Sequence, residues 1–459
     1  TIIPKVLATP NANLGIDTTV QDVTYDMDLT FPNGGGLVKA GKNKLTLTGA
    51  IDYTGDTRIE GGVLAAADGA GLPTASHLTF AGGVWAPLAT STSRALGSGA
   101  GELSFTSGLE GGFSAIGAPL TVNLGGAAAA LAYGSDLFDP SVLVLNPAGA
   151  DNPLILANPI DISAKDLTIN IDSTDAGAAV TLAGGVSGAH HLTKTGAGTV
   201  IFNGPLQLES HWLVLNGGNA EMKNSAITYG PMHDIRVNNG SKLTIDNVTV
   251  DMTAWLYAGL DGKNAEVIME SGTLNNAAGR LIVGQNANSS GTFTLKDGTV
   301  TTKHLIVGNK GTGEFIQNGG SVTDLSGDGD TVIGEYDNDN NVVGTGTYRM
   351  NGGTLTVNDN FQVGAHGTGN IIQSAGDISS SGWFVVGRFA GGVGSYVMTG
   401  GTYTSTKNPA IIGESGVGTL DVSKTAVFKA PALRLGSNAD GTGSVTVHDG
   451  GTLEVTQIN

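Results

Sequence analysis

The second half of the chain is built from one short phrase that recurs at a nearly constant interval. The phrase ends in an aliphatic residue followed by glycine, and successive closing glycines are separated by 24, 26, 30, 23, 26 and 23 residues. A fixed period of about 25 residues predicts a repeat architecture, and it is too short for β-propeller blades of about 40 to 50 residues. The closing glycines are Gly284, Gly308, Gly334, Gly364, Gly387, Gly413 and Gly436.

Side chains alternate within each repeat, as in Phe361-Gln362-Val363, where polar residues are tolerated at the middle position. A period of two indicates strands with one face in a core. Strands this short cannot bury their own apolar rows, but copies stacked about 4.8 Å apart bury all rows together. We therefore predict an all-β fold, a right-handed parallel β-helix (β-solenoid) of roughly 18 coils with about 25 residues per coil. The seven closing glycines would supply positive φ angles at its corners.

Two stretches of the first half share a different phrase. "GLVKAGKNKLTLTGAIDYTGDTRIEGGVLAA" spans 36–66, and "LTKTGAGTVIFNGPLQLESHWLVLNGGNAEM" spans 192–222. They resemble the autotransporter-associated β-strand repeat of bacterial surface proteins, although the second stretch lacks the Tyr-Thr-Gly turn. The resemblance implies a secreted passenger on a β-helical stem and names no ligand. The matching residues are Leu192, Lys194, Gly196, Gly198 and Gly204, with Tyr53, Thr54, Gly55, Gly61, Gly62 and Leu64.

From these patterns we expect one continuous solenoid with three regions. Residues 1–35 would form an N-terminal lead-in coil or cap. Residues 36–255 would form a less regular β-helix that carries the two autotransporter-type repeats, and residues 256–459 the regular repeats.

Composition narrows the functional class. The chain is glycine-rich, with 73 Gly among 459 residues, and its 22 basic and 40 acidic residues give a formal charge of −18, which repels nucleic acid. It has no Cys, and the apolar run "GGAAAALAYG" is too short to form a transmembrane segment. Because the sequence starts at Thr1, we expect a signal peptide to have been removed already and the protein to be extracellular or on the bacterial cell surface.

The search for chemistry gives no catalytic and no cofactor-binding residue. A polysaccharide lyase or hydrolase on a β-helix needs paired carboxylates from neighbouring coils, so acidic residues should recur at one coil position, and they mostly do not. We therefore predict that the protein is not an enzyme. No zinc motif is present either.

The densest acidic stretch is "DLSGDGDTVIGEYDNDNN", at 324–341. Several carboxylates on one bulging coil could hold Ca²⁺, because this hard cation takes six to eight oxygen ligands. The other interpretation is a solvated loop of turn-forming Asp and Asn residues. The candidate ligands are Asp324, Asp328, Asp330, Asp337 and Asp339.

Two other residue sets invite an interpretation. The four tryptophans are 127, 43 and 128 residues apart, which does not fit one recurring coil position, so we expect them to pack in the core or at its rim rather than to form a sugar-stacking platform. Gln317 and Gln373 stand at one repeat position, and we expect them to point inward and hydrogen-bond the backbone or each other.

The favoured function is a non-enzymatic extracellular structural protein: a rigid stalk, a filament subunit or a surface-layer component. The alternative is an adhesin or glycan-binding passenger, and a second alternative is a polysaccharide lyase or hydrolase on a β-helix. The last coil, "GGTLEVTQIN", has no polar cap, so we expect either more chain or an end-to-end or lateral homo-oligomer. Cell-surface or matrix glycans are the other expected partners.

Overall fold

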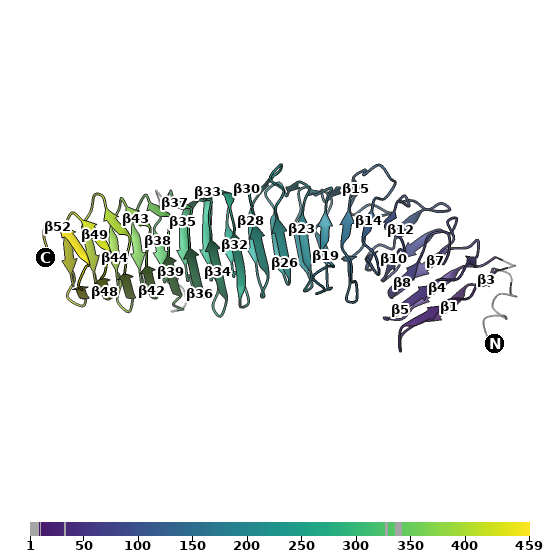
Figure 1. Ribbon diagram of the computed structural model, residues 1–459, viewed down its shortest axis with the longest axis horizontal. Coiled ribbons are helices and arrows are strands. Elements are labelled where there is room, and N and C mark those ends of the chain that lie inside the picture. The colour runs from purple at the N-terminus through teal and green to yellow at the C-terminus, as the bar shows by residue number, and fades with distance from the viewer. Residues whose placement is uncertain (1–8, 10, 32–33, 326–328, 336–341) are drawn as a thin grey trace. The chain divides into compact units, whose positions relative to one another are not determined.

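The computed structural model describes residues 9, 11–31, 34–325, 329–335 and 342–459 (Figure 1). Across this described part of the chain there are strands and no helices, and they form a parallel β-solenoid of about 18 turns with about 24 residues per turn. The predicted fold class is therefore confirmed. The chain divides into two compact units, Thr1–Glu209 (unit 1) and Ser210–Asn459 (unit 2).

Strands of unit 1 pair in parallel with their equivalents in the next coil. One set comprises β1 (Leu14–Asp17), β4 (Leu37–Ala40), β7 (Thr57–Ile59), β9 (Leu78–Phe80) and β12 (Leu103–Phe105). A second comprises β2 (Val23–Tyr25), β5 (Lys44–Leu47), β8 (Gly62–Ala66), β10 (Gly83–Ala86), β13 (Gly111–Phe113), β16 (Leu143–Leu145), β19 (Leu167–Asn170) and β22 (Leu192–Thr195). Shorter sets are β11 (Ser91–Thr92), β14 (Leu120–Val122), β17 (Leu154–Leu156), β20 (Val180–Leu182) and β23 (Thr199–Phe202); β15 (Leu131–Ala132), β18 (Ile160–Asp161), β21 (Val186–Ser187) and β24 (Leu206–Gln207); and β3 (Leu29–Thr30) with β6 (Ile51–Asp52).

Unit 2 is more regular, and its strands run as a row of parallel arrows in Figure 1. Ladder A comprises β25 (Trp212–Asn216), β28 (Asp234–Val237), β31 (Leu256–Ala258), the ends of β33 (Gly272–Val283) and β35 (Thr299–Val307), β38 (Thr331–Ile333), β41 (Phe361–Val363), β44 (Phe384–Val386), β47 (Ala410–Ile412) and β50 (Leu433–Leu435). Ladder B comprises β26 (Asn219–Met222), β29 (Lys242–Ile245), β32 (Ala265–Met269), β34 (Ser290–Leu295), β36 (Thr312–Gln317), β39 (Thr345–Met350), β42 (Thr368–Gln373), β45 (Val393–Met398), β48 (Val417–Val422) and β51 (Thr442–Val447). Ladder C comprises β27 (Thr228–Met232), β30 (Val248–Met252), the starts of β33 and β35, β37 (Ser321–Asp324), β40 (Thr354–Val357), β43 (Asp377–Ser380), β46 (Thr402–Ser405), β49 (Val427–Ala430) and β52 (Thr452–Val455).

The closing glycines turn the chain from ladder A towards ladder B. All seven have positive φ angles, between +57° and +78°. A Cβ atom on Gly364 would overlap the backbone carbonyl of Val393, in the coil that follows. The corner therefore needs glycine for two reasons, the left-handed backbone and the close approach of the neighbouring strand.

Inward side chains stack on their equivalents in adjacent coils. Phe293, Phe315 and Tyr348 of ladder B form one such stack, with ring centroids 4.8 and 4.9 Å apart and all three rings buried. Gln317 and Gln373 point inward as predicted. The Gln317 amide donates to the backbone carbonyl of Thr354 at 3.0 Å, so this buried polar group is satisfied.

Candidate functional site

Ladder A of unit 2 carries a row of buried side chains on the face that points away from the core. From β31 to β47 the first and third of three consecutive strand residues belong to the core, yet the middle residue is only 2 to 4% exposed. Several of these middle residues line open cavities, so they form the floor of a surface groove, here called the groove. The row comprises Tyr257, Ile282, Ile306, Val332, Gln362, Val385 and Ile411, and all of them except Tyr257 and Ile282 line one of the cavities.

One wall of the groove comes from the position just before each ladder A strand. The pairing register of the ladder brings these positions into a single line along the coils. The wall residues are Trp255, Arg280, His304, Asp330, Asn360 and Trp383. The opposite wall comes from residues that directly follow the corner glycines, among them Glu335, Arg388 and Glu414.

The groove widens into two adjoining cavities. The larger has a volume of about 620 Å³ and reaches from Arg280 to Phe389, and the smaller has about 200 Å³ and reaches from Asn360 to Arg434. Arg388 lines both cavities. A hollow with an apolar floor and polar walls is the usual form of a ligand site.

Arg388 sits at the centre of the charges in the groove. Its guanidinium lies 2.9 Å from a carboxylate oxygen of Asp330 and 3.6 Å from one of Glu414. Next to it, the rings of His366 and Phe389 stack with centroids 4.2 Å apart. Burial, reinforced by the Arg388 charge, lowers the pKa of His366, so this imidazole is neutral at pH 7.

Two exposed tryptophans stand on the groove wall, each beneath an arginine. The guanidinium of Arg280 lies 5.7 Å from the ring centre of Trp255, and that of Arg434 lies 5.6 Å from that of Trp383. The two rings keep 41% and 38% of their surface exposed. This corrects the expectation from spacing: Trp255 and Trp383 do occupy one coil position, and their separation of 128 residues hides it because the coils between them differ in length. Trp85, in contrast, is fully buried in unit 1.

Three of the five candidate Ca²⁺ ligands, Asp328, Asp337 and Asp339, lie outside the described residues. Asp324 is buried in the core, where one of its oxygens accepts the backbone N–H of Leu305 at 2.8 Å. Asp330 lines the groove and pairs with Arg388. Among the described residues no three His, Asp or Glu side chains cluster as metal ligands. The calcium site stays a prediction.

The lysine of the repeat phrase in unit 1 has an unusual position. Lys39 is fully buried in β4, and its ammonium donates to the carbonyls of Ala40 (2.9 Å), Gly41 (2.7 Å) and Gly61 (2.8 Å). These three bonds use all three donors of the ammonium. Burial nevertheless lowers the pKa of Lys39 to about 8, against the attraction of Asp17.

Lys194 repeats this arrangement in β22. It is 2% exposed, and its ammonium donates to the carbonyls of Gly196 at 2.6 Å and Gly198 at 2.5 Å. Burial lowers its pKa to about 8 as well. In both copies the lysine therefore closes the glycine turn that follows its own strand.

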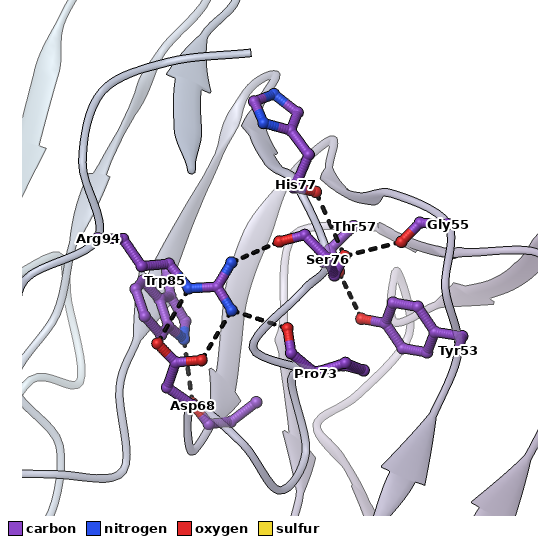
Figure 2. Close-up of polar contacts among 10 residues, drawn as sticks. Tyr53, Gly55, Thr57, Asp68, Pro73, Ser76, His77, Trp85 and Arg94 are labelled. Carbon is purple, nitrogen blue, oxygen red and sulfur yellow. Dashed lines mark hydrogen bonds and ion pairs between the residues drawn. The ribbon is translucent and has the colours of Figure 1, made fainter. Parts of the chain in front are cut away.

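The Tyr-Thr-Gly turn of the first copy leads to a buried polar cluster (Figure 2). The Tyr53 hydroxyl hydrogen-bonds that of Thr57, which lies 2.8 Å from the hydroxyl of Ser76, and Ser76 donates to the carbonyl of Gly55 at 2.9 Å. Burial raises the pKa of Tyr53 to about 12, so the phenol stays protonated at neutral pH.

Arg94 completes this cluster from a later coil. Its guanidinium binds both carboxylate oxygens of Asp68, at 3.0 and 2.7 Å, and donates to the carbonyls of Ser76 at 2.5 Å and Pro73 at 2.8 Å (Figure 2). The side chain is 4% exposed and lies 5.7 Å from the ring centre of Trp85. Arg94 therefore fixes the position of the segment between β8 and β9.

Comparison with protein families agrees with this geometry. The model of the passenger-associated transport repeat matches residues 37–66 and 192–205. These are the segments in which Lys39 and Lys194 close their glycine turns. These two segments of the chain match the passenger-associated transport repeat. The resemblance drawn from the sequence phrases is thereby confirmed. No curated protein and no solved structure matches the chain.

The two matches differ in length, and the structure shows why. The first passenger-associated transport repeat runs through Tyr53 to the glycine pair at Gly61 and Gly62, whereas the second ends at Pro205, before a segment with no equivalent of Tyr53. The second repeat therefore keeps the lysine-closed turn and loses the buried tyrosine cluster.

Sequence reasoning missed Arg94 and the groove. The signal for Arg94 was available, because an arginine within a segment of small and apolar residues needs a partner if it is buried. The groove left a weaker signal, the isoleucines and valines at middle strand positions where an exposed face would favour polar residues. The described part of this passenger-repeat chain contains no helix able to span a bilayer.

Proposed function

We propose that the chain is the passenger part of a secreted or surface-exposed bacterial protein and that its main role is structural, as a β-solenoid stem without catalytic activity. The passenger-associated transport repeats support the surface or secreted location. Support for the structural role comes from the parallel strand pairing that continues from coil to coil within each unit.

The observation that carries this proposal is the six-residue register of ladder B. From β34 to β51 each strand pairs with the next over six consecutive residues, although the intervening coils vary from 22 to 33 residues. Each coil from β34 to β48 thus binds two neighbours through a backbone ladder and a stacked core. Such an assembly resists bending because bending would open many hydrogen bonds and core contacts at once.

Electron microscopy of the purified chain tests the structural role. We expect the coils of unit 2 to form a stiff segment of uniform width within each particle. Particles without such a segment would contradict the proposal. Light scattering on the same sample over a range of concentrations tests the end-to-end or lateral self-association that a filament subunit requires. A strictly monomeric species at high concentration would contradict the role as a filament subunit.

A second candidate function is adhesion through a bound glycan. The observation in its favour is the pair of exposed tryptophans, Trp255 and Trp383, on one wall of the groove. Large aromatic rings left open to solvent in a concave surface are typical of binding sites. Glycan-array binding by the purified chain would distinguish an adhesin from a purely structural stem.

A further inference from the structure

We propose that the groove over ladder A of unit 2 binds a linear acidic glycan, with sugar rings stacked on Trp255 and Trp383 and sugar carboxylates bound by Arg280 and Arg434. This inference rests on the second candidate function, adhesion. The structural role of the solenoid does not depend on it.

The length of the groove favours a polymer. Trp255 and Trp383 lie five coils apart in the pairing register of ladder A, which corresponds to about 24 Å at a strand spacing of about 4.8 Å. The two cavities lie along this line and meet at Arg388. A compact ligand would fill one cavity only, whereas an extended chain can contact both tryptophans.

The floor and the walls match the two sides of a sugar ring. A pyranose has an apolar face of C–H groups, which packs on an indole, and a rim of hydroxyls, which needs hydrogen-bonding groups. Trp383 stands next to Asn360 in the register, and the smaller cavity adds Glu414 and Arg434 around the apolar floor at Val385 and Ile411. Both kinds of contact are therefore available within one cavity.

The charges favour an acidic glycan over a neutral one. Arg388 is already paired with Asp330 and Glu414, but within the described part of the chain Arg280 and Arg434 form no ion pair. In a protein with 40 acidic and 22 basic residues, two arginines without a carboxylate partner beside exposed tryptophans leave their donors for a ligand. A guanidinium binds a carboxylate through two parallel hydrogen bonds, which suits uronic acids.

A peptide is a poorer occupant. Peptides bind β-sheets mainly by adding a strand to an open edge. Along the groove the ladder A strands β38, β41 and β44 are paired on both sides, so the floor offers no free backbone edge. Recognition must come from side chains, as it does for a glycan.

The test is titration of the full chain with hexagalacturonate, followed by calorimetry and by tryptophan fluorescence. A neutral cello-oligosaccharide of the same length and a poly-glutamate peptide serve as comparison ligands. The variants are Trp383→Ala and Arg434→Glu, both exposed and outside the core. Arg349→Gln is the matched control, because Arg349 is an exposed arginine of ladder B that is paired with Glu314 and does not line either cavity.

We expect hexagalacturonate to bind with a change in tryptophan fluorescence, each groove variant to weaken binding at least tenfold, and Arg349→Gln to leave it within a factor of two. Equal binding of the neutral oligosaccharide, equal or tighter binding of poly-glutamate, no effect of the groove variants, or no binding at all would each overturn the inference. Electron microscopy of the groove variants separates the two proposals, since the shape of the particles should not change even where binding is lost.

Discussion

Tyr348 donates a hydrogen bond of 2.5 Å to the side-chain oxygen of Gln317 in the preceding coil, inside the core of unit 2. Tyr396 donates in the same way to Gln373. Because each glutamine amide also donates to a backbone carbonyl, the buried polar groups link successive coils without being left unsatisfied. Burial raises the pKa of both tyrosines well above the ordinary value, so their hydroxyls remain donors throughout the accessible pH range.

Replacing Tyr348→Phe should destabilise unit 2 by about 1–3 kcal/mol, because it leaves the oxygen of Gln317 buried without its donor. Urea unfolding followed by circular dichroism measures the shift of the midpoint. The double variant Gln317→Leu, Tyr348→Phe is the control, since removal of both partners should cost less than the sum of the single changes. Strict additivity would show that the hydrogen bond contributes nothing.

The buried lysine predicts a dependence of stability on pH. The pKa of Lys39 is about 8 in the folded chain and near 10.5 when exposed, so between these values the unfolded chain binds more protons than the folded one. The contribution of Lys39 therefore makes the free energy of unfolding rise with pH in this window and stay flat below it. We therefore expect the urea midpoint of the wild type, relative to that of Lys39→Met, to be higher at about pH 10 than at about pH 7.5. Lys44→Met, at a partly exposed lysine, is the control. A difference in urea midpoint between the wild type and Lys39→Met that shifts in favour of the variant at high pH would refute the prediction.

Replacing a corner glycine by alanine should cost much more stability than the same substitution in an open loop. In Gly364→Ala the new Cβ meets the carbonyl of Val393, so we expect a loss well beyond the cost of the left-handed backbone, which is about 1–2 kcal/mol. Gly391→Ala is the matched control, because its φ is +85° and a Cβ there meets nothing within 4 Å. Thermal unfolding of the two variants checks this, and equal losses would show that backbone conformation alone sets the cost.

Arg94→Lys should loosen the segment between β8 and β9. A lysine cannot reproduce the two parallel bonds to Asp68 together with the bonds to Ser76 and Pro73, so we expect a loss of about 2–4 kcal/mol. Limited proteolysis should then cut within residues 67–76. Arg58→Lys, at an exposed pair with Glu60, should change stability by less than about 1 kcal/mol. Protease resistance equal to that of the wild type would contradict the assigned role of Arg94.

The regular half of the fold was predictable because its signal is local and repeated. The period of the corner glycines and the alternation around residues such as Gln362 suffice to define parallel strands, stacked coils and inward glutamines. The lysine phrase identified the passenger repeat, yet burial of the lysine could not be predicted, because it depends on carbonyls such as that of Gly61, one coil away.

The groove was not predictable from spacing. Because the coils differ in length, the sequence distance between equivalent positions varies. That Trp255 and Trp383 lie on the same wall of the groove can therefore be recognised only from the pairing register. Long-range pairs such as Arg94 with Asp68, 26 residues apart, raise the same difficulty.

The constant register of ladder B despite coils of unequal length has a practical consequence. Eleven residues, 334–344, connect β38 to β39, whereas four, 364–367, connect β41 to β42. The two ladder B strands that follow, β39 and β42, still pair with each other over six residues. This corner is therefore a natural place to graft a foreign peptide for display, because the added chain leaves the scaffold beneath it unchanged.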